Sequence, residues 1–309
     1  MVLGGTGAMG GATALRLARA GWRVDVTGRD AALVPADLTA MGVRFHAVDR
    51  ADVGSVDRLV GDDADLLVDL VAYGSDDVAQ LLPAMRRVRS SVLVSSRAVY
   101  TDAQGRHING DEAPVFDVPI PEDAPTVPAA GPGVDPFSRE GYAPAKVAAE
   151  RAALDSGLPV TVLRPSKVHG PWARNARTRA FVERMRAGDR VIPLARRGAS
   201  VDHLTAAANA AALVEVVADA PGARVLNVAD PDTPAAVEIV RAIADELAWD
   251  GELELLAPGV DGGAHPWNST HPIVLDTAAA ARLGYRPVGP ALDLLRDEVR
   301  WVAAGPSAR

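Results

Sequence analysis

The chain has 309 residues, which is long enough for a nucleotide-binding domain with a smaller partner. Forty acidic residues against 32 basic residues give a formal net charge of -8, so we expect no broad basic face for nucleic acid or for an anionic membrane. The absence of cysteine excludes disulfides, thiolate nucleophiles and zinc-thiolate sites. No run approaches the ~18 to 20 apolar residues of a membrane span, so the cytoplasm is the expected location, and no metal is expected because the six histidines show no ligand pattern.

The first thirty residues predict a strand, a glycine-rich turn, a helix and a second strand. The first strand is short, at residues 2–3, and either it is clipped or the natural start lies upstream. The helix is predicted at 12–20 and the second strand at 22–27. This order is that of the βαβ unit that binds dinucleotides. Its tight turn, its close approach to the pyrophosphate and its close helix packing are assigned to Gly4, Gly7 and Gly10.

The residue that follows the second strand bears on the choice of cofactor. An acidic residue there binds the adenosine ribose hydroxyls, whereas an arginine accommodates a 2′-phosphate. Asp25 lies within the strand and is too early for the ribose role. Arg29 therefore favours NADP(H), while its neighbour Asp30 keeps NAD(H) as the alternative.

The next segments alternate between strand and helix patterns. Strands are predicted at 43–48, 65–71 and 92–95, and helices at 55–60 and 76–88, the latter interrupted near Pro83. This alternation predicts an α/β fold with a doubly wound parallel sheet of the Rossmann type. Residues 101–141 are rich in Pro, Gly, Asp and Ala without a steady period, and are predicted to form a long loop across the mouth of the cleft.

Past Pro171 the chain is expected to enter a smaller C-terminal substrate-binding lobe. Phe181, Val182 and Met185 form the apolar stripe of one predicted helix. The arginines around the stripe either hold a substrate phosphate or carboxylate or form a solvated helix face, which is the simpler interpretation; they are Arg174, Arg177, Arg179, Arg184 and Arg186.

Further helices are predicted at 205–218 and 234–247, a sheet strand at 224–228, and small strands at 253–256 and 273–275. We therefore predict a dinucleotide-binding domain at 1–170, to which the strand at 224–228 and its preceding helix return. The substrate-binding lobe is predicted at 171–200 and 232–309.

Four motifs in this order resemble the short-chain dehydrogenase/reductase superfamily, particularly its extended and atypical branch, the NAD-dependent epimerase/dehydratase family. They are the glycine turn at 4–10, the segment 94–100 (VSSRAVY), the Tyr-x-x-x-Lys at 142–146 and the segment 163–171 (LRPSKVHGP). Residues 119–125 and 276–287 match the family's acidic-proline segment and its closing helix. Residues 129–141 make the approach to the tyrosine longer than the family usually has.

The resemblance implies a catalytic set of Ser96, Tyr142 and Lys146. Tyr142 would exchange a proton with the substrate oxygen, which Ser96 would orient, and Lys146 would also bind the nicotinamide ribose. The four-residue spacing places Tyr142 and Lys146 on one helix face, where the ammonium is expected to favour the phenolate of a group whose ordinary pKa is ~10. Only two of the 32 basic residues are lysines, at 146 and 167, which points to chemistry that arginine cannot replace.

The resemblance also implies a set of cofactor contacts. Asp49 would contact the adenine, with a simple loop cap as the alternative. Arg97 and Lys167 are substrate candidates, although Lys167 could equally be a surface lysine. The full cofactor set is Gly4, Thr6, Gly7, Ala8, Met9, Gly10, Arg29, Asp49, Val71, Ala72, Lys146, Pro165, Ser166 and Val168.

The leading hypothesis is an NADPH-dependent reductase of a carbonyl on a small organic substrate, with Tyr142 as the proton donor. The first alternative is a nucleotide-sugar epimerase or dehydratase that retains NAD. The second is a non-catalytic NADP-binding regulatory protein. The resemblance also allows a homodimer that pairs through residues 80–88 and 142–154. The pattern of residues does not identify the substrate.

Overall fold

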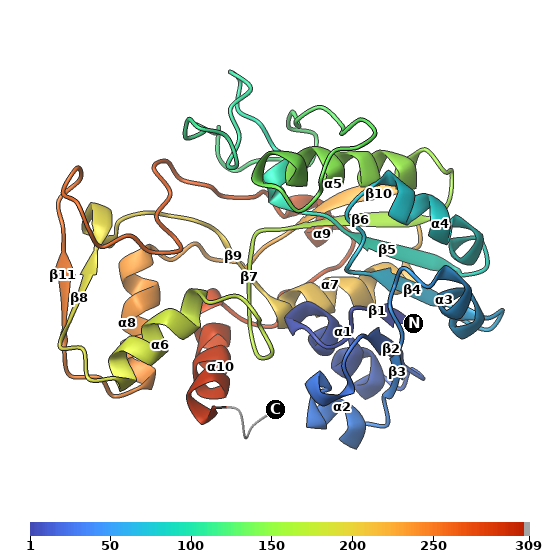
Figure 1. The fold of residues 1–309 in the computed structure, drawn as a ribbon, viewed down its shortest axis with the longest axis horizontal. Helices are drawn as coiled ribbons and strands as arrows, with labels where there is room; N and C mark the ends of the chain where they lie inside the picture. Colours follow the sequence, from blue (N-terminus) through green and yellow to red (C-terminus); the bar gives the residue numbers. More distant parts are fainter. Residues whose placement is uncertain (306–309) are drawn as a thin grey trace.

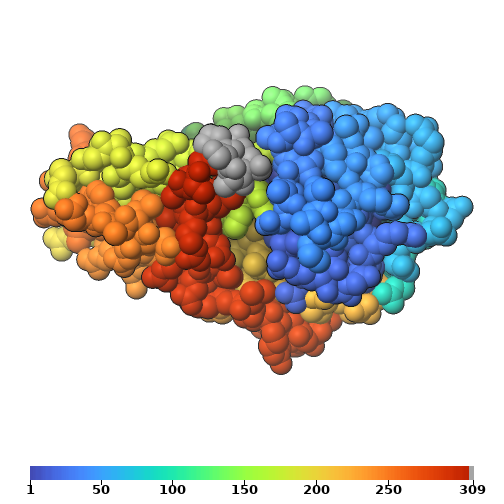
Figure 2. Space-filling view, turned by 90° about the horizontal axis from the view of Figure 1, so that it is seen from below, coloured from blue at the N-terminus to red at the C-terminus, as the bar shows by residue number. Residues whose placement is uncertain are grey.

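The computed structural model describes residues 1–305, which form a parallel sheet covered by helices on both faces and a lobe beside it (Figure 1). Seen from below, the blue N-terminal half and the yellow-to-red lobe lie side by side (Figure 2). No helix in this part of the chain is long and apolar enough to cross a membrane.

The central sheet has seven parallel strands in the order β10-β6-β5-β4-β1-β2-β3. Its innermost strands are buried along their whole length, as expected for a parallel sheet covered on both faces. This order confirms the predicted doubly wound Rossmann sheet. The strand bounds are β1 (Val2–Leu3), β2 (Asp25–Gly28), β3 (Arg44–Ala47), β4 (Leu66–Asp69), β5 (Ser90–Val94), β6 (Val160–Pro165) and β10 (Arg224–Val228).

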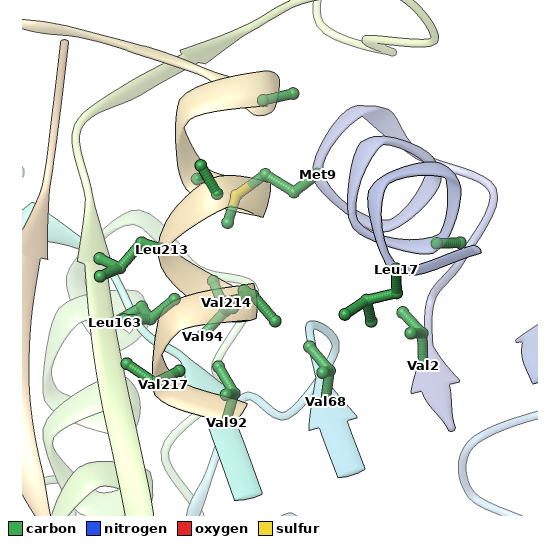
Figure 3. Close-up of a cluster of buried hydrophobic side chains, with 14 of the residues drawn as sticks. Val2, Met9, Leu17, Val68, Val92, Val94, Leu163, Leu213, Val214 and Val217 are labelled. Carbon is green, nitrogen blue, oxygen red and sulfur yellow. The ribbon is translucent and has the colours of Figure 1, made fainter. Parts of the chain in front are cut away.

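Two layers of helices bury the sheet. One face is covered by α1 (Ala8–Arg19) and α7 (Ala207–Asp219), whose apolar side chains meet those of the strands in one core cluster (Figure 3). The other face is covered by α3 (Val53–Val60), α4 (Ser75–Met85) and α5 (Arg139–Leu154). A short helix, α2 (Ala36–Ala40), packs against α1.

The lobe has an apolar core of its own. Phe181 stacks on Trp267 with ring centroids 5.7 Å apart, and both side chains are buried. Two short strand pairs belong to this half of the molecule or lead to it: β8 (Val191–Leu194) with β11 (Glu252–Leu255), and β7 (Lys167–His169) with β9 (Leu204–Ala206). The helices of the lobe core are α6 (Arg177–Arg186), α8 (Ala236–Glu246) and α10 (Ala291–Ala304).

Several predicted elements differ from the structure. Residues 273–275 form no strand and make only isolated bridges, Ile273 to Asp202 and Leu275 to Ile120. α4 runs through Pro83 without interruption. α10 was not among the predicted helices. α9 (Ala278–Arg282) packs on β10, so this part of the predicted lobe belongs to the core of the sheet, and residues 306–309 of the predicted lobe lie outside the described residues.

Candidate active site

The glycine turn between β1 and α1 provides an open site for an anion. Gly4 has φ of +85°, in the left-handed region that favours glycine. A Cβ atom on Gly10 would lie 2.2 Å from the carbonyl oxygen of Gly4, whereas a Cβ on Gly7 would meet no atom within 4 Å. α1 starts after Gly7 without a side-chain cap and without an acidic residue in its first turn. Its first N–H groups thus lack a side-chain partner beside open space, which fits a phosphate group.

A cleft of about 710 Å³ runs from this turn along the carboxyl ends of the central strands. Small-molecule sites usually measure ~300–1,000 Å³. Of the residues predicted to bind the cofactor, the cleft is lined by Gly4, Thr6, Gly7, Ala8, Met9, Gly10, Arg29, Asp49, Val71 and Val168. Those outside its lining are Ala72, Lys146, Pro165 and Ser166.

At the end of the cleft beside β2, the exposed Arg29 belongs to the lining and Asp30 does not. The Asp30 carboxylate accepts the N–H of Ala32 at 2.9 Å, so it caps its own turn. Asp49 both lines the cleft and accepts the N–H of Ala51 at 2.9 Å, so the loop-cap interpretation and the cleft position hold together. Arg29 is thus the charged side chain that this end of β2 offers to a ligand.

Lys146, on α5, lies behind the other end of the cleft, where its ammonium contacts the ring of Tyr73 in the lining, and it is only 4% exposed. Its Nζ donates hydrogen bonds to the carbonyl oxygens of Ala72, at 2.6 Å, and Val94, at 3.1 Å. Burial lowers the pKa of Lys146 to about 8, although Asp69 and other carboxylates oppose this shift. Ala72 therefore contributes a hydrogen-bond acceptor for Lys146, and its side chain is fully buried.

Ser96, Tyr142 and Lys146 converge where β5 ends. The Lys146 Nζ lies 5.9 Å from the centre of the Tyr142 ring. Burial raises the pKa of Tyr142, a hydrogen bond with Ser96 lowers it, and the neighbouring Tyr73 raises it. The sequence predicts that the Lys146 ammonium favours the phenolate of Tyr142, and in the structure this ammonium donates to two main-chain carbonyl groups. Burial is the largest influence on the pKa of Tyr142.

Ser95 points away from this set, as the alternation of a strand requires. Its hydroxyl donates to Glu150, which also receives two hydrogen bonds from Arg164, at 3.0 and 2.6 Å. All three side chains are buried. This network joins β5 and β6 to α5, so the Ser95 hydroxyl serves a structural contact.

Aromatic side chains that the sequence did not single out cover the same end of the cleft. Tyr73 lies 4.6 Å below the Lys146 Nζ, measured to its ring centre, and meets Tyr142 edge-on at 6.4 Å. Phe137, from the long loop, packs on Tyr73 with ring centres 4.8 Å apart and lines the cleft with Pro136. An aromatic residue inside an otherwise small and polar loop is the signal that could have identified Phe137.

A second segment folds over the glycine turn. Arg174 donates to the Thr6 hydroxyl at 2.7 Å and lines the cleft with Asn175. Trp172, whose φ is +65°, lies so close to Gly11 that a Cβ there would be 2.6 Å from its ring. The sequence groups Arg174 with the solvated face of a helix, but α6 begins only at Arg177.

The remaining predicted residues serve structural contacts. Ser166 bonds to the carbonyl oxygen of His203 and to the hydroxyl of Thr205, which joins β6 to the β9 segment. Pro165 is the buried last residue of β6.

Within residues 1–305, no group of three or more His, Asp or Glu side chains could hold a metal ion. Arg97 and Lys167 meet at Asp202, beside the end of β5.

Comparisons with known proteins agree with this architecture. The model of the NAD dependent epimerase/dehydratase family matches residues 1–229. Similar solved structures include UDP-glucose 4-epimerase from Thermotoga maritima with UDP-glucose, at 19% identity and TM-score 0.71, covering 97% of each chain. A dTDP-glucose 4,6-dehydratase from Bacillus anthracis with NAD has 17% identity and TM-score 0.71, covering 99% of this chain and 96% of its own.

A putative epimerase from Burkholderia cenocepacia has 22% identity and TM-score 0.74, covering 98% of this chain and 97% of its own. These likenesses show the fold. No curated protein matches the sequence. The family model covers most of the chain, including all the strands of the central sheet. The chain therefore belongs to the NAD-dependent epimerase/dehydratase family, the extended branch of the short-chain dehydrogenases/reductases.

Proposed function

We propose that the protein is an epimerase or dehydratase that oxidises a secondary alcohol of a nucleotide sugar and keeps its cofactor through the cycle. The observation that carries this proposal is the convergence of Ser96, Tyr142 and Lys146 next to one end of a cleft, whose lining there includes Tyr73 and Val94. The same cleft contains the glycine turn and, beside β2, Arg29. The similar structures, which include a UDP-glucose complex and an NAD complex, support this alternative better than the free carbonyl reductase that the sequence placed first.

The cleft fits a nicotinamide dinucleotide. The open space at Gly7 and the uncapped start of α1 would hold the pyrophosphate, and Arg174 adds a positive charge beside Thr6. The bound dinucleotide would supply the hydride acceptor of the reaction.

The side chains around the reacting carbon divide the remaining work. Ser96 would hold the hydroxyl of the substrate toward Tyr142. The phenolate form of Tyr142 would take the proton of that hydroxyl during oxidation, and the resulting phenol would return it during reduction. Lys146, with a pKa of about 8, keeps most of its charge at neutral pH and would use it to hold the nicotinamide ribose. Tyr73 and Phe137 would shield this end from water.

Arg29 supports a second candidate, a reductase with dissociable NADPH. Its guanidinium lies at the adenosine end, where a 2′-phosphate would be placed, and Asp30 is occupied by the N–H of Ala32. NADP(H) is therefore our proposed preference if the cofactor exchanges freely. If the protein instead retains NAD through the cycle, Arg29 no longer supports a preference for NADP(H).

The test begins by denaturing the purified protein and identifying any released dinucleotide by mass spectrometry. The stripped protein is then titrated with NADH and NADPH, alongside Arg29→Ala and the control Arg23→Ala, an exposed arginine outside the cleft lining. Tightly held cofactor, with turnover of UDP-hexoses that needs none added, supports the proposal. Weak NADPH binding that is lost in Arg29→Ala, together with carbonyl reduction, would favour the reductase. Binding of neither cofactor would contradict both.

A further inference from the structure

A cluster of buried charges lies directly beside the catalytic serine. Arg97 follows Ser96 in the chain, is only 7% exposed, and forms an ion pair with the buried Asp202. The Lys167 Nζ lies 3.2 Å from the other oxygen of the same carboxylate and donates to the carbonyl oxygen of Pro266 at 2.5 Å. The cluster therefore joins the end of β5 and the start of β7 to the segment before β9.

The positive charges in this cluster exceed the negative ones. Arg177 bonds to the carbonyl oxygen of Val168 at 2.7 Å, and no carboxylate in residues 1–305 lies within ion-pair distance of it. Burial lowers the pKa of Lys167, Asp202 opposes that shift, and the charges of Arg97 and Arg177 lower it further. Two buried carboxylates face the three cations, because the charge of Glu298 as well as that of Asp202 raises the pKa of Arg177 against the effect of burial. One positive charge remains in excess, an arrangement that costs free energy in a buried place unless an anion joins it.

Nitrogen donors remain available in the cluster. Within the described part of the chain, Arg97 donates from Nη1 to Asp202 and no other acceptor is bonded to its guanidinium. The planar guanidinium can hold two oxygens of one anion at once, and the Lys167 ammonium adds a third donor direction.

The position of the cluster defines which part of the substrate it would meet. Val94 and Val168 line the end of the cleft that would hold the nicotinamide. Arg97 follows Val94 by three residues, and Lys167 directly precedes Val168. Arg97 also directly follows Ser96, so an anion bound by both cations would lie beside the end of β5.

We infer that Arg97 and Lys167 bind an anionic group of the substrate, a carboxylate or a phosphate within a few bonds of the reacting hydroxyl. The anion would share the two cations with Asp202. This inference rests on the proposed function and narrows its substrate class to acidic sugars. An uncharged sugar would leave the excess positive charge unbalanced and would bind less tightly.

The test compares acidic and neutral members of matched probe pairs by isothermal titration, with and without NADH present. The pairs are UDP-glucuronate against UDP-glucose and glucose 6-phosphate against glucose. A charge-assisted contact predicts that the acidic member binds about 10- to 100-fold more tightly. An advantage confined to the first pair identifies a carboxylate, and one confined to the second pair identifies a phosphate.

Three variants test whether the acidic preference depends on this cluster. Lys167→Met keeps the pair between Arg97 and Asp202 and should remove most of the acidic preference. Asp202→Asn removes the competing carboxylate and should increase it. Arg186→Met, which replaces an exposed arginine on α6, should leave it unchanged.

Equal affinity for acidic and neutral probes in the unaltered protein would overturn the inference, as would an acidic preference that persists in Lys167→Met. NADH fluorescence in the same samples reports the cofactor site separately. If the unaltered protein does not bind NADH, the proposed function is contradicted. The ratio of the affinities for acidic and neutral probes decides separately whether the anion site exists.

Discussion

Replacing Lys146 by methionine removes a buried ammonium whose charge the folded protein disfavours. Burial lowers the pKa of this group from 10.5 to about 8. Between these values the unfolded chain keeps the proton that the folded protein has lost, so the stability of the unaltered protein rises with pH in this window. At about 1.4 kcal/mol for each factor of ten in the ionisation constant, the full effect is about 3 kcal/mol, and about 2 kcal/mol of it falls between pH 7 and pH 9.5.

The assay is urea unfolding of both proteins at several pH values in this range. Lys146→Met lacks the titrating group but also leaves the carbonyl oxygens of Ala72 and Val94 without their donor, a loss that does not change with pH. The unaltered protein should therefore gain about 2 kcal/mol over the variant from pH 7 to pH 9.5. Arg151→Met, an exposed change on the same helix, keeps Lys146, so the difference in stability between this variant and the unaltered protein should not change with pH. A difference between the unaltered protein and Lys146→Met that stays constant with pH would refute the lowered pKa.

Two further predictions concern the glycine turn. Gly10→Ala places a Cβ 2.2 Å from the Gly4 carbonyl oxygen, so it should destabilise the protein by about 1–3 kcal/mol and abolish ADP binding. The Cβ of Gly7→Ala meets no protein atom, so this variant should lose ADP affinity with little change in the free energy of unfolding. Urea unfolding and calorimetric titration with ADP would separate the two variants, and equal destabilisation would contradict the geometry. Arg174→Ala should weaken ADP binding about tenfold while leaving adenosine binding unchanged, because only ADP carries the charge that this guanidinium would meet; an equal loss for both ligands in the same titration would show that Arg174 acts through the fold.

The sequence was informative where structure depends on local requirements. The glycine spacing identified the turn because Gly4 needs a positive φ and Gly10 tolerates no side chain. Even here α1 begins at Ala8, four residues before its predicted start, because two glycines belong to its first turns. The parallel sheet followed from the alternation of strands and helices, whose periods are also local.

Contacts between distant segments could not be predicted in the same way. The direction of the Lys146 side chain depends on the carbonyl groups of β5 and of the segment after β4. The burial that raises the pKa of Tyr142 likewise depends on contacts between distant segments. Phe137 and Arg174 line the cleft only because their loops fold back over the sheet. The partners of Arg97 and Lys167 likewise depend on how the segment that carries Asp202 packs.

The central claim is that one cleft places the nicotinamide of a bound dinucleotide beside Ser96, Tyr142 and Lys146. A crystal structure of the protein with NADH tests it most directly. The account predicts the pyrophosphate on the N–H groups after Gly7 and the nicotinamide ring next to the Tyr142 hydroxyl. A pyrophosphate bound away from the glycine turn, or a nicotinamide ring remote from Tyr142, would contradict it.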